Sequence, residues 1–142
     1  MQIFIKRVNS SLPMPQFHSD KAAGFDLMAR KTMNIKAHSV SYVPLNVIVK
    51  MPDNCWALLA ARSSLHKKGL IMANGIGVGD ADYCGESDEY MAILYNYTDS
   101  DVTIEQGDRI AQMIILPRSE ITLKEVKSVS KVSRGGIGST GK

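Results

Sequence analysis

Apolar residues alternate with polar ones in several short stretches of the chain, and this spacing of two predicts β-strands. Turn-forming Pro, Gly, Asn and Asp residues separate the stretches. Short strands divided by regular turns are typical of a sandwich or barrel, so the pattern predicts an all-β fold. The apolar stretches that carry this prediction are Ile3-x-Ile5, Val40-x-Tyr42, Val47-x-Val49 and Met91–Tyr95.

Two segments need separate interpretation. Ser63–Lys68 predicts a short helix, because it begins with residues suited to an N-cap and is followed by Gly69, which suits the left-handed stop. Arg109–Leu116 fits a helix or a buried strand, and its β-branched residues favour the strand. From Ser128 onward the sequence is small, polar and glycine-rich. We therefore expect a β-domain over residues 1–130 and a flexible C-terminal arm over residues 131–142.

Composition and charge narrow the class of protein. The chain has 142 residues, of which 44% are hydrophobic and 22% charged, as in an ordinary globular domain. Its net charge of +3 is spread along the chain, unlike the basic stripe of a nucleic-acid-binding protein. No apolar stretch approaches the roughly 18 residues of a membrane span, and no signal-peptide pattern is present. With only two cysteines, we expect a cytoplasmic protein with no nucleic-acid or membrane partner.

Two common catalytic patterns are missing from the sequence. Zinc-dependent deamination needs a His-x-Glu and a Pro-Cys-x-x-Cys motif, and a serine hydrolase needs a Gly-x-Ser-x-Gly elbow. The segment Asn74–Gly85 is more informative, because glycines bracket Asp80 and Asp82 and Tyr83 follows. A carboxylate beside an aromatic surface at the tip of a β-hairpin predicts a general base. The same residues also fit a Gly/Asp turn that only joins two strands.

Five segments resemble, in order, the motifs of the trimeric dUTP diphosphatases (dUTPases). Five motifs in family order are far more specific than one, and they span nearly the whole chain. The resemblance implies a jelly-roll-like fold, a homotrimer with sites at subunit contacts, and hydrolysis of dUTP to dUMP and pyrophosphate. It also implies that each C-terminal arm closes over a site. The segments are Ala23–Leu27, Arg62–Leu65 with Lys68–Leu70, Asn74–Gly85, Gly107–Gln112 and Gly136–Gly141.

The resemblance also implies roles for single residues. Asp80 falls on the catalytic aspartate, which activates the water that attacks the α-phosphorus, and Tyr83 on the tyrosine beneath the deoxyribose. Asn74 and the backbone after it, including Gly77, correspond to the strand that reads uracil. Mg²⁺ is held mainly by the triphosphate, so no direct protein ligand is implied. Further substrate-binding positions are Arg62, Ser63, Ser64, Gln112, Arg134, Ile137, Gly138, Ser139 and Thr140, with Asp26 and Arg109 as supporting residues.

Other interpretations stay open. Arg62 is equally suited to a structural ion pair with Asp26, Gln112 to satisfying buried backbone groups, and Arg109 to anchoring a strand. At the level of function, one alternative is a diverged, non-catalytic dUTPase scaffold that senses the nucleotide or binds a protein through the acidic segment 86–89. Another is an enzyme related to dCTP deaminase.

The sequence departs from the family pattern in the base site and in the arm. Gly79 stands where the family has a bulky aliphatic residue, which predicts a looser backbone around Asp80. The stretch between Gly85 and Asn96 is longer than usual. Ile137 replaces a phenylalanine that stacks over uracil, and the arm is shorter than usual. We therefore expect a weaker lid, with the base-catalysed step retained.

Overall fold

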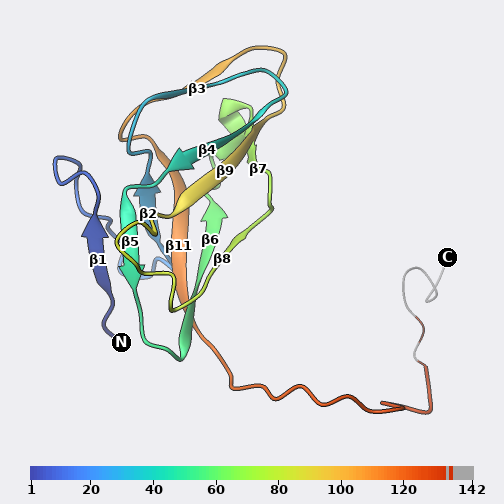
Figure 1. Cartoon of the computed structure of the whole chain (residues 1–142). Coiled ribbons are helices and arrows are strands. Elements are labelled where there is room, and N and C mark those ends of the chain that lie inside the picture. The colour runs from blue at the N-terminus through green and yellow to red at the C-terminus, as the bar shows by residue number, and fades with distance from the viewer. Residues whose placement is uncertain (134, 136–142) are drawn as a thin grey trace.

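The computed structural model describes residues 1–133 and 135, and strands dominate them. Burial alternates along β9, as the apolar pattern predicts, so the all-β prediction is confirmed (Figure 1). The elements are β1 (Phe4–Arg7), β2 (Phe25–Met28), β3 (Met33–Ile35), β4 (Val40–Pro44), β5 (Val47–Lys50), β6 (Cys55–Ala61), the 3-10 helix η1 (Leu65–Lys68), β7 (Leu70–Met72), β8 (Gly77–Gly79), β9 (Met91–Asn96), β10 (Val102–Ile104) and β11 (Arg109–Pro117).

Within the described residues the strands form small antiparallel sheets. The largest has the order β2-β11-β6-β8, and a second has the order β4-β9-β7. Two-stranded pairs, β1 with β5 and β3 with β10, complete the body. One hydrophobic core lies between these sheets, and it includes the fully buried side chains of Leu27, Ile35, Leu94, Ile104 and Met113.

Strand β11 sets the register of the largest sheet. It pairs with β6 from Ala111 opposite Ala61 to Pro117 opposite Cys55, which confirms the strand predicted over residues 109–116. On its other side it pairs with β2 and places Gln112 opposite Asp26. Two segments that lie far apart in the sequence therefore share one row across the sheet.

The predicted short helix is present as the 3-10 helix η1. Gly69 follows it with φ +77°, the left-handed stop that the sequence predicts, while Ser64 at the N-cap makes no capping bond through its side chain. A Cβ at Gly69 would also collide with the Thr98 methyl group. Both backbone conformation and space therefore require glycine at this position.

The segment from Asn74 to Gly85 does not begin as the predicted hairpin. β7 pairs with β9, whereas β8 pairs with β6, so the turn at residues 73–76 carries the chain from one sheet to the other. Gly75 in this turn has φ +71°. The predicted hairpin with Asp80 at its tip is not formed, because β8 pairs with β6 whereas the next strand, β9, pairs with β4 and β7. Asp80 consequently lies after β8 rather than at a hairpin tip.

Beyond β11 the chain leaves the body and runs away from it (Figure 1). Residues 118–133 are exposed and form no strand. Several of their side chains are apolar, and Leu123 is 93% exposed. No helix in the described part of the chain has the length and apolar character of a membrane span.

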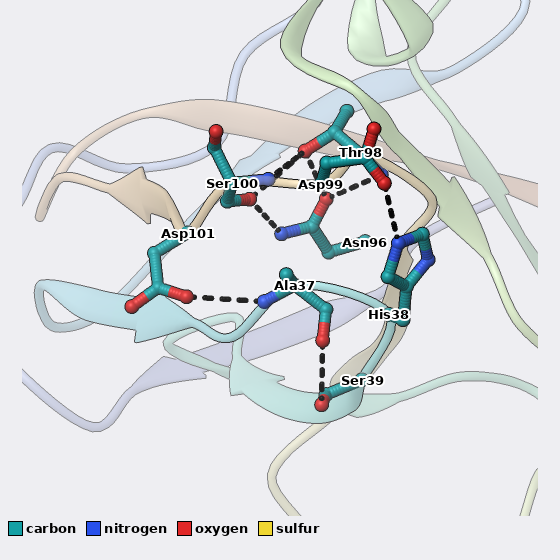
Figure 2. Close-up of polar contacts among 8 residues, drawn as sticks. All are labelled: Ala37, His38, Ser39, Asn96, Thr98, Asp99, Ser100 and Asp101. Atoms are coloured by element: carbon teal, nitrogen blue, oxygen red, sulfur yellow. Dashed lines mark hydrogen bonds and ion pairs between the residues drawn. The ribbon is translucent and has the colours of Figure 1, made fainter.

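A buried asparagine ties the turn after β9 to the loop after β3 (Figure 2). Asn96 is fully buried, and its amide donates to the carbonyls of Ile35 at 3.0 Å and Ser100 at 2.8 Å. Its side-chain oxygen accepts from the backbone N–H of Thr98 at 2.9 Å. Figure 2 shows two further links between the same loops, from His38 to Asp99 and from Ala37 to Asp101.

We predict that Asn96→Ala lowers the free energy of unfolding by about 3 kcal/mol, because it leaves several backbone groups buried without partners. Urea unfolding at a fixed protein concentration measures the change. Ser87→Ala, in an exposed loop, is the control and shifts the same quantity by less than about 0.5 kcal/mol. An Asn96→Ala value as small as that of the control would contradict the structural role of Asn96.

Candidate active site

A hollow of about 310 Å³ opens between β8 with the turn after it and the strands β4 and β9. Its size lies at the lower end of the range of small-molecule pockets. Its lining is mainly apolar and aromatic, with one carboxylate. The sequence-predicted residues Gly77, Asp80 and Tyr83 all line it, and Asn74 lies beyond this lining, in the exposed turn before β8.

The turn after β8 presents Asp80 to solvent. Backbone bonds close this turn, from the N–H of Tyr83 to the carbonyl of Asp80 at 3.2 Å and from the N–H of Cys84 to the carbonyl of Asp82 at 2.9 Å. Asp80 also borders a second hollow, which Trp56 and Arg118 help to line. Its exposed carboxylate can therefore meet water and a ligand at the same time.

Tyr83 is fixed at both ends of its side chain. Its hydroxyl donates to the carbonyl of Glu89 at 3.2 Å. Its ring packs edge-on against Tyr90, with centroids 5.2 Å apart and planes at 86°. The side chain is nevertheless 40% exposed, so a flat aromatic surface remains available beside Asp80.

The prediction that Gly79 loosens the backbone is corrected by its packing. Gly79 is buried, and the Tyr90 side chain occupies the space where a Cβ at position 79 would lie. Burial, together with nearby charge on Tyr83, Asp80 and Cys84, raises the pKa of Tyr90 to about 12, so the hydroxyl is neutral at pH 7.

The stretch between Gly85 and Asn96 is anchored in the body. Glu89 is buried, and its carboxylate accepts two hydrogen bonds from Arg30, at 2.8 and 2.9 Å, and one from the backbone N–H of Asn46 at 2.8 Å. The bond to Glu89 raises the pKa of Arg30. Glu89 therefore belongs to the interior rather than to the exposed acidic surface suggested by the sequence of residues 86–89.

A second group of predicted residues gathers around Asp26. The Oδ2 atom of Asp26 lies 2.9 Å from Nε of Arg62 and 3.4 Å from Nη1 of Arg109. His18 Nε2 lies 3.2 Å from the same oxygen and accepts from Arg109 at 2.7 Å. These cations and donors make the site suited to phosphate.

The structural roles left open for Arg62 and Gln112 are both present. Arg62 forms the ion pair with Asp26, and Gln112 donates to the carbonyl of Ala61 at 3.0 Å. Ser63 and Ser64 are exposed directly after Arg62, at the start of the turn into η1. Arg109 begins β11, and the preceding Gly107 has φ +87°.

Some site residues escape sequence reasoning and others lie outside the structure. His18, Arg30, Glu89 and Tyr90 carry no sequence motif, and several of their contacts, such as Arg30–Glu89 and His18–Arg109, join residues distant in the chain. The acidic segment 86–89 is the one sequence signal that points to Glu89. The predicted positions Arg134, Ile137, Gly138, Ser139 and Thr140 lie outside the described residues.

Among the residues that the structure describes, no three His, Cys, Asp or Glu side chains converge as a metal site.

Strand β6 separates the two groups of residues. Gly79 pairs with Ala57 near the start of β6, so Asp80 lies beside Trp56, whereas Arg62 follows the end of the strand. At the rise of a β-strand, these two ends are roughly 20 Å apart. Within one chain the carboxylate of Asp80 and the arginine cluster thus lie at opposite ends of β6.

Comparisons with known proteins agree on one family. The family model described as dUTPase matches residues 10–141. The deoxyuridine 5'-triphosphate nucleotidohydrolase of Rickettsia felis is 38% identical over 146 residues, which cover 99% of this chain and 97% of the relative. The enzyme of that name from Alcanivorax borkumensis is 32% identical over 142 residues, covering 96% and 93% of the two chains.

Solved structures agree with these sequence relatives. The dUTPase of Streptococcus mutans superposes with a TM-score of 0.77 at 29% identity, over 83% of this chain and 98% of the other. The dUTPase of Staphylococcus bacteriophage 80alpha with dUPNHPP gives 0.85 at 24% identity, over 99% and 98% of the chains, and is similar in fold. The jelly-roll-like fold prediction is confirmed. The chain belongs to the dUTPase family of hydrolases.

Proposed function

We propose that this protein hydrolyses dUTP to dUMP and pyrophosphate, with Asp80 as the general base. The observation that carries the proposal is the meeting of Asp80, Tyr83 and the backbone of β8 around one hollow. The relatives named for dUTP hydrolysis match this chain over nearly its whole length, which supports the same substrate.

The hollow suits a deoxynucleoside. Tyr83 offers an aromatic face on which the sugar packs. β8 is an edge strand, paired with β6 on one side in the described structure, and backbone groups on its other side are available to bond the edge of uracil. Fixed donors and acceptors discriminate strongly, because a base with the wrong pattern leaves them unpaired.

The carboxylate of Asp80 performs the chemical step in this proposal. It accepts a proton from a bound water, whose oxygen forms a bond to the α-phosphorus as the bond to the bridging oxygen breaks. Pyrophosphate leaves with the electron pair of that bond. Mg²⁺ bound through the triphosphate oxygens supplies charge neutralisation, and in this proposal it has no direct protein ligand.

We infer that the complete site is assembled from copies of the chain in a homotrimer. The strand β6 keeps the backbone beside Asp80 roughly 20 Å from that of Arg62, which supports their acting on one substrate from different copies. A second copy supplies Arg62, Ser63, Ser64 and Gln112 to the phosphates. The exposed apolar side chains of residues 118–133 support a further contact between copies.

The remaining predictions belong to the same proposal. The C-terminal arm, residues 131–142, closes over the bound nucleotide and brings Arg134, Ile137, Gly138, Ser139 and Thr140 to it. The protein acts in the cytoplasm, and its two free cysteines suit a reducing compartment. The non-catalytic alternative loses one of its supports, because Gly79 lies in a tightly packed contact rather than a loosened one.

One substrate panel tests the activity. The protein is incubated with Mg²⁺ and each deoxynucleoside triphosphate in turn, and pyrophosphate and the nucleoside products are measured. We expect pyrophosphate and dUMP from dUTP alone. Binding of dUTP with no product from any substrate would favour the nucleotide-sensing scaffold, and uracil nucleotides made from dCTP would favour the deaminase.

We predict that Asp80→Asn lowers kcat for dUTP by about 100- to 10,000-fold, because the amide cannot accept the proton from water. Binding of a non-hydrolysable imido analogue of dUTP is retained. Asp82→Asn is the matched control two residues away, and its kcat stays within a few-fold of that of the unmodified protein. An active Asp80→Asn variant would rule out Asp80 as the base.

We predict that a chain ending at Ser130 folds and trimerises, since the strands end at Pro117. Its kcat/KM for dUTP falls by about 100-fold, because closure over the substrate is lost. Light scattering reports the oligomer and pyrophosphate release reports turnover. Full activity in the truncated chain would remove the arm from the mechanism.

A further inference from the structure

The position before Asp80 admits only glycine while Tyr90 keeps its place. A Cβ at Gly79 would lie 2.7 Å from Cε1 and 2.8 Å from Cζ of Tyr90, and closer still to its hydroxyl oxygen. Gly79 has no positive φ, so space rather than backbone conformation excludes a side chain. The Tyr90 ring is packed directly onto the backbone of β8.

Tyr90 cannot easily withdraw from this contact. Its side chain is 6% exposed. Its backbone N–H donates to the carbonyl of Val47, and its carbonyl accepts from the N–H of Leu45, both at 2.9 Å. The neighbouring Glu89 is held by its ion pair with Arg30. These contacts therefore hold Tyr90 in place against Gly79.

Tyr90 also touches the other side of the turn that carries Asp80. Its ring makes the edge-on contact with Tyr83 at 5.2 Å, and the backbone N–H of Tyr83 bonds the carbonyl of Asp80. One side chain thus contacts the residue before Asp80 and the residue that closes the turn after it. The carboxylate itself stays exposed to the hollow.

The Tyr90 hydroxyl is buried and has no hydrogen-bond partner among the described residues. An unpaired buried hydroxyl lowers stability, so its presence calls for a reason. The hydroxyl is the atom that reaches farthest over Gly79. The Tyr90 hydroxyl occupies the space that a side chain at position 79 would fill.

We propose that Tyr90 is a positioning residue for Asp80: packed into the space above Gly79 and against Tyr83, it holds the turn in the geometry from which the carboxylate acts. This inference rests on the proposed function of Asp80. Small misplacements of a reacting group cost large factors in rate, so the clamp acts on kcat more than on nucleotide affinity.

A double-mutant cycle tests the clamp. Gly79→Ala introduces the clash and Tyr90→Leu removes the three atoms that meet it, so each single variant lowers kcat for dUTP by about 100-fold. The combined variant G79A/Y90L recovers kcat to within about 10-fold of the unmodified protein. Tyr97→Leu, the same substitution outside the hollow, leaves kcat unchanged.

Tyr90→Phe provides a second test if Tyr90→Leu does not fold. Tyr90→Phe removes the closest of the three clashing atoms and keeps the other two. We therefore expect kcat to rise from G79A to G79A/Y90F and again to G79A/Y90L. Thermal unfolding confirms that each compared variant is folded, and the Kd of the imido analogue stays within about three-fold throughout.

The outcomes separate this inference from the proposed function. If the unmodified protein hydrolyses dUTP but the single variants keep full kcat, or the double variant is no better than the worse single one, Tyr90 does not position Asp80. A parallel loss of kcat and of analogue binding would also overturn the inference, because it would indicate a collapsed hollow. An unmodified protein without dUTP hydrolysis would instead overturn the proposed function.

Discussion

The pairing of β6 with β8 on one side and with β11 on the other is the constraint on which the site depends. It holds Asp80 near the start of β6 and places Arg62 just beyond its end, with Asp26 and Gln112 in one row at that end. Because an extended strand is rigid along its length, these groups keep their separation in a folded chain. In the proposed function, both groups act on one triphosphate, so this separation is the reason for assigning them to different copies of the chain.

The strands and the family could be predicted from the sequence, because period-two burial and ordered motifs are local signals. The partners of β8 and β9 could not, since these consecutive strands lie in different sheets instead of forming the predicted hairpin, and no local pattern encodes that choice. The same limit applies to the site: Asp80 and Tyr83 stand in a motif, whereas His18 meets Arg109, which lies far along the chain. The predicted ion pair of Arg62 with Asp26 is present, but no sequence pattern predicted that His18 would lie beside it.

Gly79 shows how a single unusual residue can mislead when it is interpreted alone. In isolation Gly79 predicts a loosened backbone. In the structure, the stretch before β9 places Tyr90 against it. The Arg30–Glu89 ion pair anchors that stretch in the body. Packing next to the proposed base is thereby restored with different residues.

We propose that Asp80 and Arg62 serve one substrate from different chains. Complementation measures this directly: inactive Asp80→Asn chains and inactive Arg62→Ala chains are unfolded together, refolded as mixed oligomers and assayed for dUTP hydrolysis. In sites shared between chains, some mixed sites receive both intact residues, so activity returns to roughly a quarter of that of the unmodified protein. Mixed oligomers that stay as inactive as either parent would contradict the claim, because every site would then draw Asp80 and Arg62 from the same chain.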